Sequence, residues 1–108
     1  MLTFAPWEGV RGLRHGFLDR RLAVGLAGWE IIDDGGPPRP VTTPRQVHGT
    51  RVVTATAGAD RPEADGIVTA APGRLVGVVT ADCVPILLLD RSRRTVAAVH
   101  AGWRGAAA

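Results

Sequence analysis

Lysine and tyrosine are absent from this chain of 108 residues, and cysteine occurs only once. A single cysteine excludes an internal disulfide framework and a zinc site built from cysteines alone, and it fits a reducing compartment. Long apolar runs are missing too, because no segment approaches the roughly 18 consecutive apolar residues of a membrane helix. The first 15 residues also lack the apolar region of a signal peptide. We therefore expect a cytoplasmic protein with no membrane partner.

The positive charge of the chain comes from arginine alone, with 13 basic residues, a net charge of +3 and a sequence pI of about 10.9. Almost no group in this chain has a pKa between that of cysteine and that of arginine. The calculated pI is therefore high even without a dense positive surface. The arginines are scattered, and the few aromatic residues do not alternate with them as a single-strand binding surface requires. We therefore predict no nucleic-acid partner.

The composition, 45% apolar and 21% charged, is typical of one small globular domain, here residues 1–108. A loop rich in glycine and proline, residues 33–40, separates a weakly patterned N-terminal section from the rest. In that first section we expect either short strands or one strand and one helical turn. Strand-like segments follow the loop at 51–55, 67–69, 75–79, 84–89 and 95–100. The apolar runs 75–79 and 84–89 are so continuous that we expect both strands to be buried on both faces.

The last two strands are predicted to form a hairpin around a polar four-residue loop, residues 91–94. If Asp90 lies opposite Thr95, then Pro85 lies opposite His100. Cys83 shares the parity of Pro85, so it lies diagonal to His100 on the same sheet face, with about 7–8 Å between their α-carbons. The register alone therefore predicts that Cys83 and His100 meet.

Two histidines, His48 and His100, and the single cysteine, Cys83, occupy comparable places at the ends of predicted strands. Two imidazoles and a thiolate with one open position are the ligand set of a catalytic zinc, which lowers the pKa of its bound water to about 7. The same ligand types occur in a blue-copper centre. Such a centre commonly has an axial methionine ligand, and the only methionine in this sequence is Met1. A third alternative is a Cys83 nucleophile activated by one of the two histidines. The residues leave these alternatives open.

Polar residues near these positions suggest a larger site. Asp82 interrupts two apolar runs, where an unpaired carboxylate is costly to bury. Arg104 and the backbone N–H groups of residues 102–105 could hold an anion or phosphate at the start of a helix. Asp65 is a weaker candidate for orienting a ligand, because a turn explains it equally well. Residues 106–108 resemble the first turn of a helix that continues past the end of this sequence.

The motifs of residues 45–105 resemble the successive signatures of the YfiH family, whose members were first labelled polyphenol oxidoreductase or laccase-domain proteins and are now described as purine nucleoside phosphorylases. The segments that carry the resemblance are Gln46-Val47-His48-Gly49, Ala64-Asp65-Gly66, Thr80-Ala81-Asp82-Cys83-Val84-Pro85 and Ala98-Val99-His100-Ala101-Gly102-Trp103-Arg104-Gly105. The N-terminal signature of the family matches only faintly at residues 15–17. The Arg-Gly-Gly-Val-Ser type segment that usually follows is absent from residues 18–26.

The resemblance implies an α+β fold in which mixed β-sheets pack with helices, and family members are longer than this chain. It implies that His48, Cys83 and His100 bind zinc, with copper as the alternative metal, and act as the catalytic centre. The implied partners are phosphate and a purine nucleoside, namely adenosine, inosine or S-methyl-5′-thioadenosine, with adenosine deamination as a second activity. For substrate binding we expect Arg104, Gln46 and Asp82, the last two as outer positioning groups.

Three further interpretations stay open at this stage. A cysteine hydrolase that uses Cys83 with a histidine base would be inactivated by alkylation of its thiol and would be indifferent to chelators. A copper-dependent polyphenol oxidase would instead need a redox-active metal centre. An inactive fragment would turn over no nucleoside at all. The sequence also leaves open whether two subunits pair as a homodimer.

Overall fold

The computed structural model describes residues 3–17, 23–24, 29–31, 39–55, 61–80 and 84–101. The chain divides into two compact units, Met1–Pro40 and Val41–Ala108. The boundary between them coincides with the end of the predicted glycine- and proline-rich loop. That loop is shorter than predicted at its C-terminal end, because Arg39 and Pro40 already belong to strand β3. Pro40 is compatible with a strand of this kind because proline is tolerated in a β-strand at an edge or near its start.

The first unit contains one helical turn and two short strands, which combines features of the two predicted alternatives. Its elements are α1 (Ala5–Glu8), β1 (Ala23–Val24) and β2 (Trp29–Ile31), and β1 pairs with β2 in antiparallel orientation. The second residue of the helix is Pro6, whose fixed φ suits the first helical turn. The ring of Trp7 meets the rings of Phe4 and His15 edge to face, at centroid distances of 5.6 and 5.3 Å. The backbone N–H of Phe4 donates to Nε2 of His15 at 2.9 Å, which joins the two ends of this segment.

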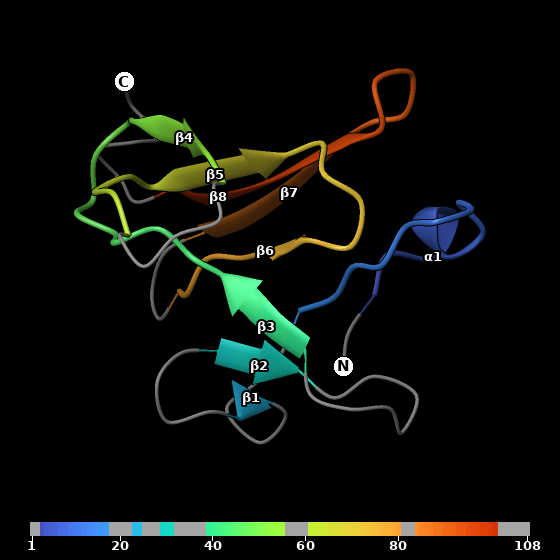
Figure 1. The fold of residues 1–108 in the computed structure, drawn as a ribbon, viewed down its shortest axis with the longest axis horizontal. Coiled ribbons are helices and arrows are strands. Elements are labelled where there is room, and N and C mark those ends of the chain that lie inside the picture. The colour runs from blue at the N-terminus through green and yellow to red at the C-terminus, as the bar shows by residue number, and fades with distance from the viewer. Residues whose placement is uncertain are drawn as a thin grey trace. The chain divides into compact units, whose positions relative to one another are not determined.

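The second unit is built on a four-stranded mixed sheet in the order β4-β5-β8-β7 (Figure 1). Its strands are β4 (Val52–Thr54), β5 (Gly66–Thr69), β7 (Val84–Asp90) and β8 (Thr95–Ala101). Strands β4 and β5 run parallel, whereas β5 and β7 are both antiparallel to β8. Strand β6 (Leu75–Val76) pairs in parallel with Val41 and Thr42 at the end of β3 (Arg39–Thr42), and it packs against β5 and β8.

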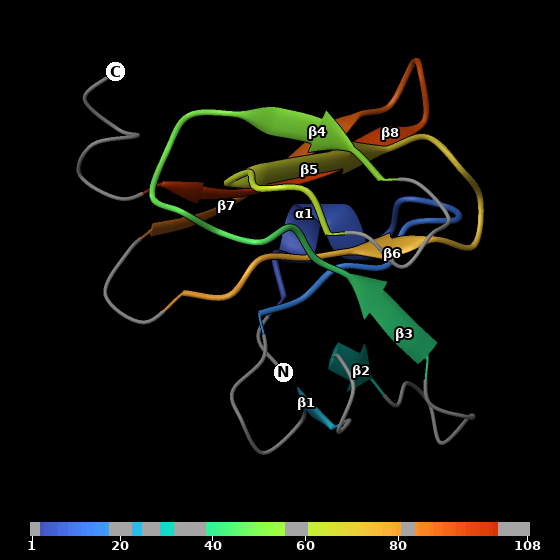
Figure 2. The ribbon, with the colours of Figure 1, turned by 60° about the vertical axis from the view of Figure 1, so that its left-hand side comes forward.

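The hairpin of β7 and β8 has the register that the sequence predicted, and it extends past the shorter strands of its sheet (Figure 2). Asp90 is paired with Thr95 and Pro85 with His100, around a turn over residues 91–94. The carboxylate of Asp90 accepts hydrogen bonds from the backbone N–H groups of Ser92 and Arg93, at 3.1 and 3.2 Å. An aspartate that caps its own turn in this way favours the turn locally, so nearby residues alone fix the register.

The prediction that residues 75–79 and 84–89 are buried on both faces is wrong. Only Leu75 and Val76 of the first run form a strand, and they are half-buried. In β7 exposure alternates along the strand, and Val84 and Leu88 are 59% and 53% exposed. The physical reason is that one face of β7 is left uncovered among the described residues, so that alternate side chains are exposed. A continuous apolar run reports hydrophobicity but not the number of layers that cover it.

Two buried apolar side chains lie in the centre of this sheet, where Ile67 of β5 is paired with Ala98 of β8, and Ala64 is buried just before β5. The strands of this sheet pair in both parallel and antiparallel orientation, which confirms the predicted α+β class with mixed sheets. Within the described ranges α1 is the only helix, so the helices expected to pack on the sheet are not among them. The helix expected to begin at residues 106–108 lies outside the described residues. No helix in the described parts of the chain is long and apolar enough to cross a membrane.

Candidate metal and nucleoside site

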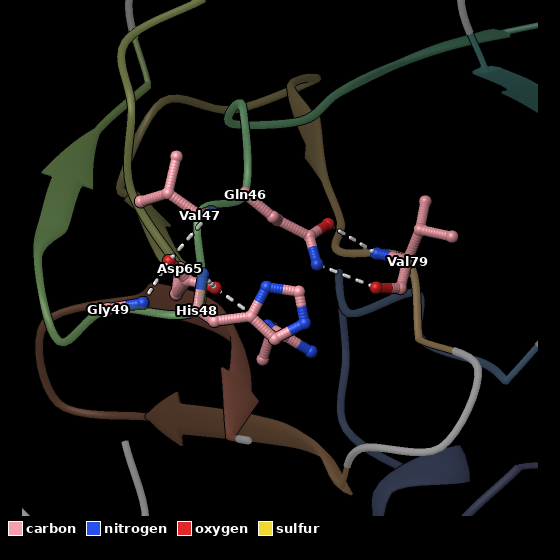
Figure 3. Close-up of polar contacts among 7 residues, drawn as sticks. Gln46, Val47, His48, Gly49, Asp65 and Val79 are labelled. Carbon is pink, nitrogen blue, oxygen red and sulfur yellow. Dashed lines mark hydrogen bonds and ion pairs between the residues drawn. The ribbon is translucent and has the colours of Figure 1, made fainter. Parts of the chain in front are cut away.

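Asp65, immediately before β5, is the polar centre of the second unit, and only 2% of its surface is exposed. Three consecutive backbone N–H groups of the loop that contains His48 point at its carboxylate (Figure 3). Oδ1 accepts from Val47 and Gly49, at 3.1 and 2.8 Å, and Oδ2 accepts from His48 at 3.0 Å. This geometry anchors the loop to the start of β5.

The same carboxylate also holds His100, which lies near the end of β8 and is 4% exposed. Nδ1 of His100 is 2.7 Å from Oδ2 of Asp65. The backbone N–H of His100 donates in turn to the carbonyl oxygen of Asp65, at 2.6 Å. Side chain and backbone together therefore fix the position of His100 relative to Asp65.

The environment of Asp65 favours its ionised form. Burial acts to raise the pKa of this carboxyl, but the hydrogen bond from His100 and the three from the backbone of the loop outweigh it, so the pKa lies below its usual 3.8. An ionised carboxylate can only accept hydrogen bonds, so Nδ1 of His100 carries the proton that is shared with Oδ2. This assignment rests on the hydrogen-bond network, and it leaves Nε2 of a neutral His100 with a free lone pair.

His48 lies against His100, with ring centroids 5.0 Å apart and planes at 85°. Unlike His100, its side chain is exposed. Its backbone has φ of 62°, a left-handed conformation that is uncommon for residues other than glycine. The three backbone hydrogen bonds to Asp65 offset the free-energy cost of this backbone conformation. Their N–H groups reach one carboxylate only when the loop turns tightly. The fold thus brings together two imidazoles that are 52 positions apart in the sequence, and one of them rests on a buried carboxylate.

The segment before His48 is held by side chains of residues 61–63. The guanidinium of Arg61 donates to the carbonyl oxygen and the hydroxyl of Thr43, at 3.0 and 2.8 Å, and to the carbonyl oxygen of Pro44 at 2.9 Å. Thr43 and Pro44 are buried. Arg45 forms an exposed ion pair with Glu63 at 3.2 Å, which contributes little stability because water screens it. The Arg61 contacts are therefore the ones that fix the entry to the loop.

Gln46 uses both ends of its side-chain amide on the backbone of Val79 (Figure 3). Its Nε2 donates to the carbonyl oxygen of Val79 at 2.6 Å, and its Oε1 accepts from the N–H of Val79 at 2.8 Å. The side-chain amide thus forms the two hydrogen bonds that a neighbouring strand would otherwise form with the backbone of Val79. This contact agrees with a positioning role for Gln46, and its predicted part in substrate binding stays a prediction.

The remaining predicted site residues, Cys83, Asp82 and Arg104, lie outside the described residues. Val84, which follows Cys83 in the chain, pairs with Ala101, which follows His100. Among the described residues no three side chains of histidine, cysteine, aspartate or glutamate are grouped so as to hold a metal ion. The described part of the site therefore brings two imidazoles together, and metal binding by His48, His100 and Cys83 stays a prediction.

Comparison with known proteins decides the family. The family model described as multi-copper polyphenol oxidoreductase laccase matches residues 18–108. The chain belongs to this family. The match confirms the resemblance drawn from the motifs, which are of the same laccase or YfiH type, and it extends that resemblance toward the N-terminus beyond the motif-bearing residues 45–105.

Relatives of this laccase-type family member carry two kinds of name. A purine nucleoside phosphorylase of Deinococcus radiodurans is 38% identical over 84% of this chain and 44% of its own length. An adenosine deaminase from an unknown prokaryotic organism is 39% identical over 82% of this chain and 35% of its own length. The chain thus spans less than half of each of these relatives.

Two solved structures share the fold of this family member. A Neisseria meningitidis protein of the DUF152 family is 44% identical, with a TM-score of 0.54 over 62% of this chain and 28% of its own. The YlmD protein of Geobacillus stearothermophilus is 35% identical, with a TM-score of 0.55 over 61% of this chain and 28% of its own. Both likenesses support the mixed-sheet architecture described above.

Sequence reasoning gave Asp65 too little weight. In the sequence it stands between alanine and glycine, a context that a turn explains. The signal that could have raised its rank is its place directly before a short buried strand, where an unpaired carboxylate is costly. What the sequence alone does not show is that both histidines converge on it.

Proposed function

We propose that this chain carries the metal site of a zinc-dependent purine nucleoside phosphorylase, which acts on adenosine, inosine and S-methyl-5′-thioadenosine and deaminates adenosine as a second activity. His48, His100 and Cys83 are the proposed zinc ligands. The proposal concerns the whole enzyme as well as this chain, because the relatives that carry these activities in their names are more than twice as long.

The observation that carries the proposal is the pair of imidazoles on a buried carboxylate. Histidines that bind a metal through one ring nitrogen almost always donate the other N–H to a carboxylate or carbonyl group, which fixes the ring and raises its basicity. His100 has this arrangement, with Nδ1 on Asp65 and Nε2 left for a ligand. His48 lies beside it at 5.0 Å between centroids. The donor set of two imidazoles fits zinc, and a thiolate from Cys83 would complete three protein ligands with one position open.

Within these 108 residues the supply of ligands favours zinc over a cluster of several copper ions. They contain three histidines and one cysteine, and their only methionine is the first residue. A multi-copper cluster needs more imidazoles than one such chain offers, and a blue-copper centre commonly uses an axial methionine. The word copper in the family's description therefore does not by itself assign a metal to this chain.

The names of the relatives supply the reaction class. In phosphorolysis an oxygen of phosphate bonds to C1′ of the ribose while the bond from C1′ to the purine nitrogen breaks, and the released base takes up a proton. Bound zinc would supply Lewis-acid chemistry, which suits deamination of a purine ring directly. For the chain's own residues, we assign Arg104 to hold phosphate through charge-assisted hydrogen bonds. Asp82 and Gln46 are assigned to position the groups around the site.

Metal analysis of the purified chain tests the proposal. We expect about one zinc per chain, lost in Cys83→Ser and in His48→Asn. Asparagine tolerates the left-handed backbone of residue 48, so His48→Asn removes the imidazole without adding strain. Arg94→Asn is the matched control, because Arg94 has a similar φ of 49° in the hairpin turn and is predicted to keep the zinc. Well-folded wild-type protein without zinc contradicts the proposal and favours a Cys83 nucleophile.

Activity assays separate the roles of the residues. Zinc-loaded protein is expected to release hypoxanthine from inosine only when phosphate is present, and a chelator should abolish this activity. Arg104→Ala should raise the phosphate concentration required while zinc is retained. Loss of zinc in Arg104→Ala would instead make Arg104 a structural residue.

A further inference from the structure

The geometry points to Asp65 as the positioning residue that sets both histidine ligands before a metal arrives. This inference rests on the proposed function, because it gives Asp65 a role in the same metal site. Asp65 itself binds no metal in this proposal, since its carboxylate oxygens are occupied by Val47, His48, Gly49 and His100.

The hydrogen bonds of Asp65 connect three separate segments of the second unit. Its carboxylate binds the loop 47–49 and the ring of His100, as described above. Its carbonyl oxygen accepts from the N–H of His100, and its own N–H donates to the carbonyl oxygen of Arg51 before β4. Asp65 is thus tied through both its side chain and its backbone, so its carboxylate has little freedom to move.

For His100 the consequence is a fixed ring. The contact of 2.7 Å between Nδ1 and the carboxylate selects the tautomer with the proton on Nδ1 and sets the direction of Nε2. Without this acceptor, either nitrogen of the ring could carry the proton. A ligand that must first change its tautomer binds a metal less tightly than one that is prepared.

For His48 the consequence is a fixed loop. Its backbone stays in the left-handed region while three consecutive N–H groups point at one carboxylate. An exposed side chain on an unanchored loop would sample many positions relative to His100. The anchored loop instead holds the two rings edge to face at 5.0 Å.

A purely structural role for Asp65 would affect folding only, so the test must separate zinc affinity from stability. Asp65→Asn keeps the size of the side chain but replaces one acceptor oxygen with an N–H₂ donor, which cannot accept from the loop or from His100. Asp90→Asn is the matched control. Asp90 also accepts backbone N–H bonds in a turn, at Ser92 and Arg93, but it lies at the far end of the hairpin from His100.

The experiment is a zinc titration of the full chain in competition with a coloured chelator, with circular dichroism to establish folding. We expect Asp65→Asn to fold and to bind zinc about 10- to 100-fold more weakly than the wild type, while Asp90→Asn stays within about twofold. A folded Asp65→Asn variant with wild-type affinity overturns the role of Asp65 and leaves the proposed function intact. A folded wild type that binds no zinc overturns the proposed function itself.

A second measurement decides the inference if Asp65→Asn does not fold. Long-range ¹⁵N–¹H spectra of the metal-free wild type report which ring nitrogen of each histidine carries the proton. We expect the Nδ1–H tautomer for His100, with Nε2 unprotonated. The opposite tautomer, with the proton on Nε2, would show that Asp65 does not prepare this ligand.

Discussion

Replacing Gly66 with alanine tests how closely β4 and β5 approach beside the site. Gly66 follows Asp65 and pairs in parallel register with Val52. A β-carbon on residue 66 would lie 2.9 Å from Cγ2 of Val52, and 3.5 Å from its Cβ and Cγ1. A separation of 2.9 Å is shorter than van der Waals contact, so either the valine or the strand must move. We expect Gly66→Ala to destabilise the fold.

The expected size of this effect follows from two opposing terms. Crowding a packed site with an extra carbon costs about 1–3 kcal/mol. Alanine also restricts the unfolded chain, which stabilises the folded state by about 0.4–1 kcal/mol. The net loss is then roughly 1–2 kcal/mol. A domain of this length is stable by about 5–15 kcal/mol, so the variant should still fold.

Urea unfolding followed by circular dichroism measures this loss. With a slope of about 2 kcal/mol per molar urea, the middle of the usual range, the midpoint should fall by roughly 0.5–1 M with the slope unchanged. Val52→Ala removes the crowding atoms, and because Val52 is 56% exposed this change alone should cost less than about 1 kcal/mol. In the Val52→Ala background, Gly66→Ala should therefore be neutral or stabilising. An equal cost in both backgrounds would refute the reasoning, because the two changes would then be independent.

Three further predictions concern the core, the segment after β6 and the hairpin. Ile67→Val should reduce the free energy of unfolding by about 0.5–1.5 kcal/mol, because Ile67 is only 2% exposed. The matched control Ile86→Val, at a site 37% exposed, should change it by less than about 0.5 kcal/mol. Equal urea midpoints for the two variants would contradict the placement of the core. Gln46→Ala removes both hydrogen bonds to the backbone of the segment after β6, so amide hydrogen exchange at residue 79 should accelerate, and unchanged exchange would contradict the clamp. The hydrogen bond from Ser92 holds the pKa of Asp90 below 3.8, so Asp90 stabilises the fold above pH 3.8 and loses this contribution as the pH falls through its lowered pKa. The stability difference between wild type and Asp90→Asn should shrink over that range in acid unfolding, and a constant difference would show that the carboxylate is not engaged.

Local patterns decided much of the second unit. Polar residues between two apolar runs predicted the turn over residues 91–94, and this fixed the pairing of Pro85 with His100. The predicted strand-like segment 51–55 contains β4, the segment 67–69 lies within β5, and the predicted glycine- and proline-rich loop ends where the two units divide. These features depend on residues within a few positions of one another, so the sequence carries them directly.

Burial and long-range hydrogen bonding were decided only by the tertiary structure. The apolar run in β7 does not show that one face of this strand stays uncovered among the described residues. The amide of Gln46 contacts a backbone 33 positions away.

The sequence by itself determined the family through its motifs, and it led to the prediction that His48 and His100 carry the chemistry together with the cysteine that precedes β7. The tertiary structure decided that Asp65 joins the two histidines, across separations of 17 and 35 residues. The physical reason is that residue types and turns are local properties, whereas a carboxylate becomes a shared acceptor only when β5 pairs with β8 and places these segments side by side.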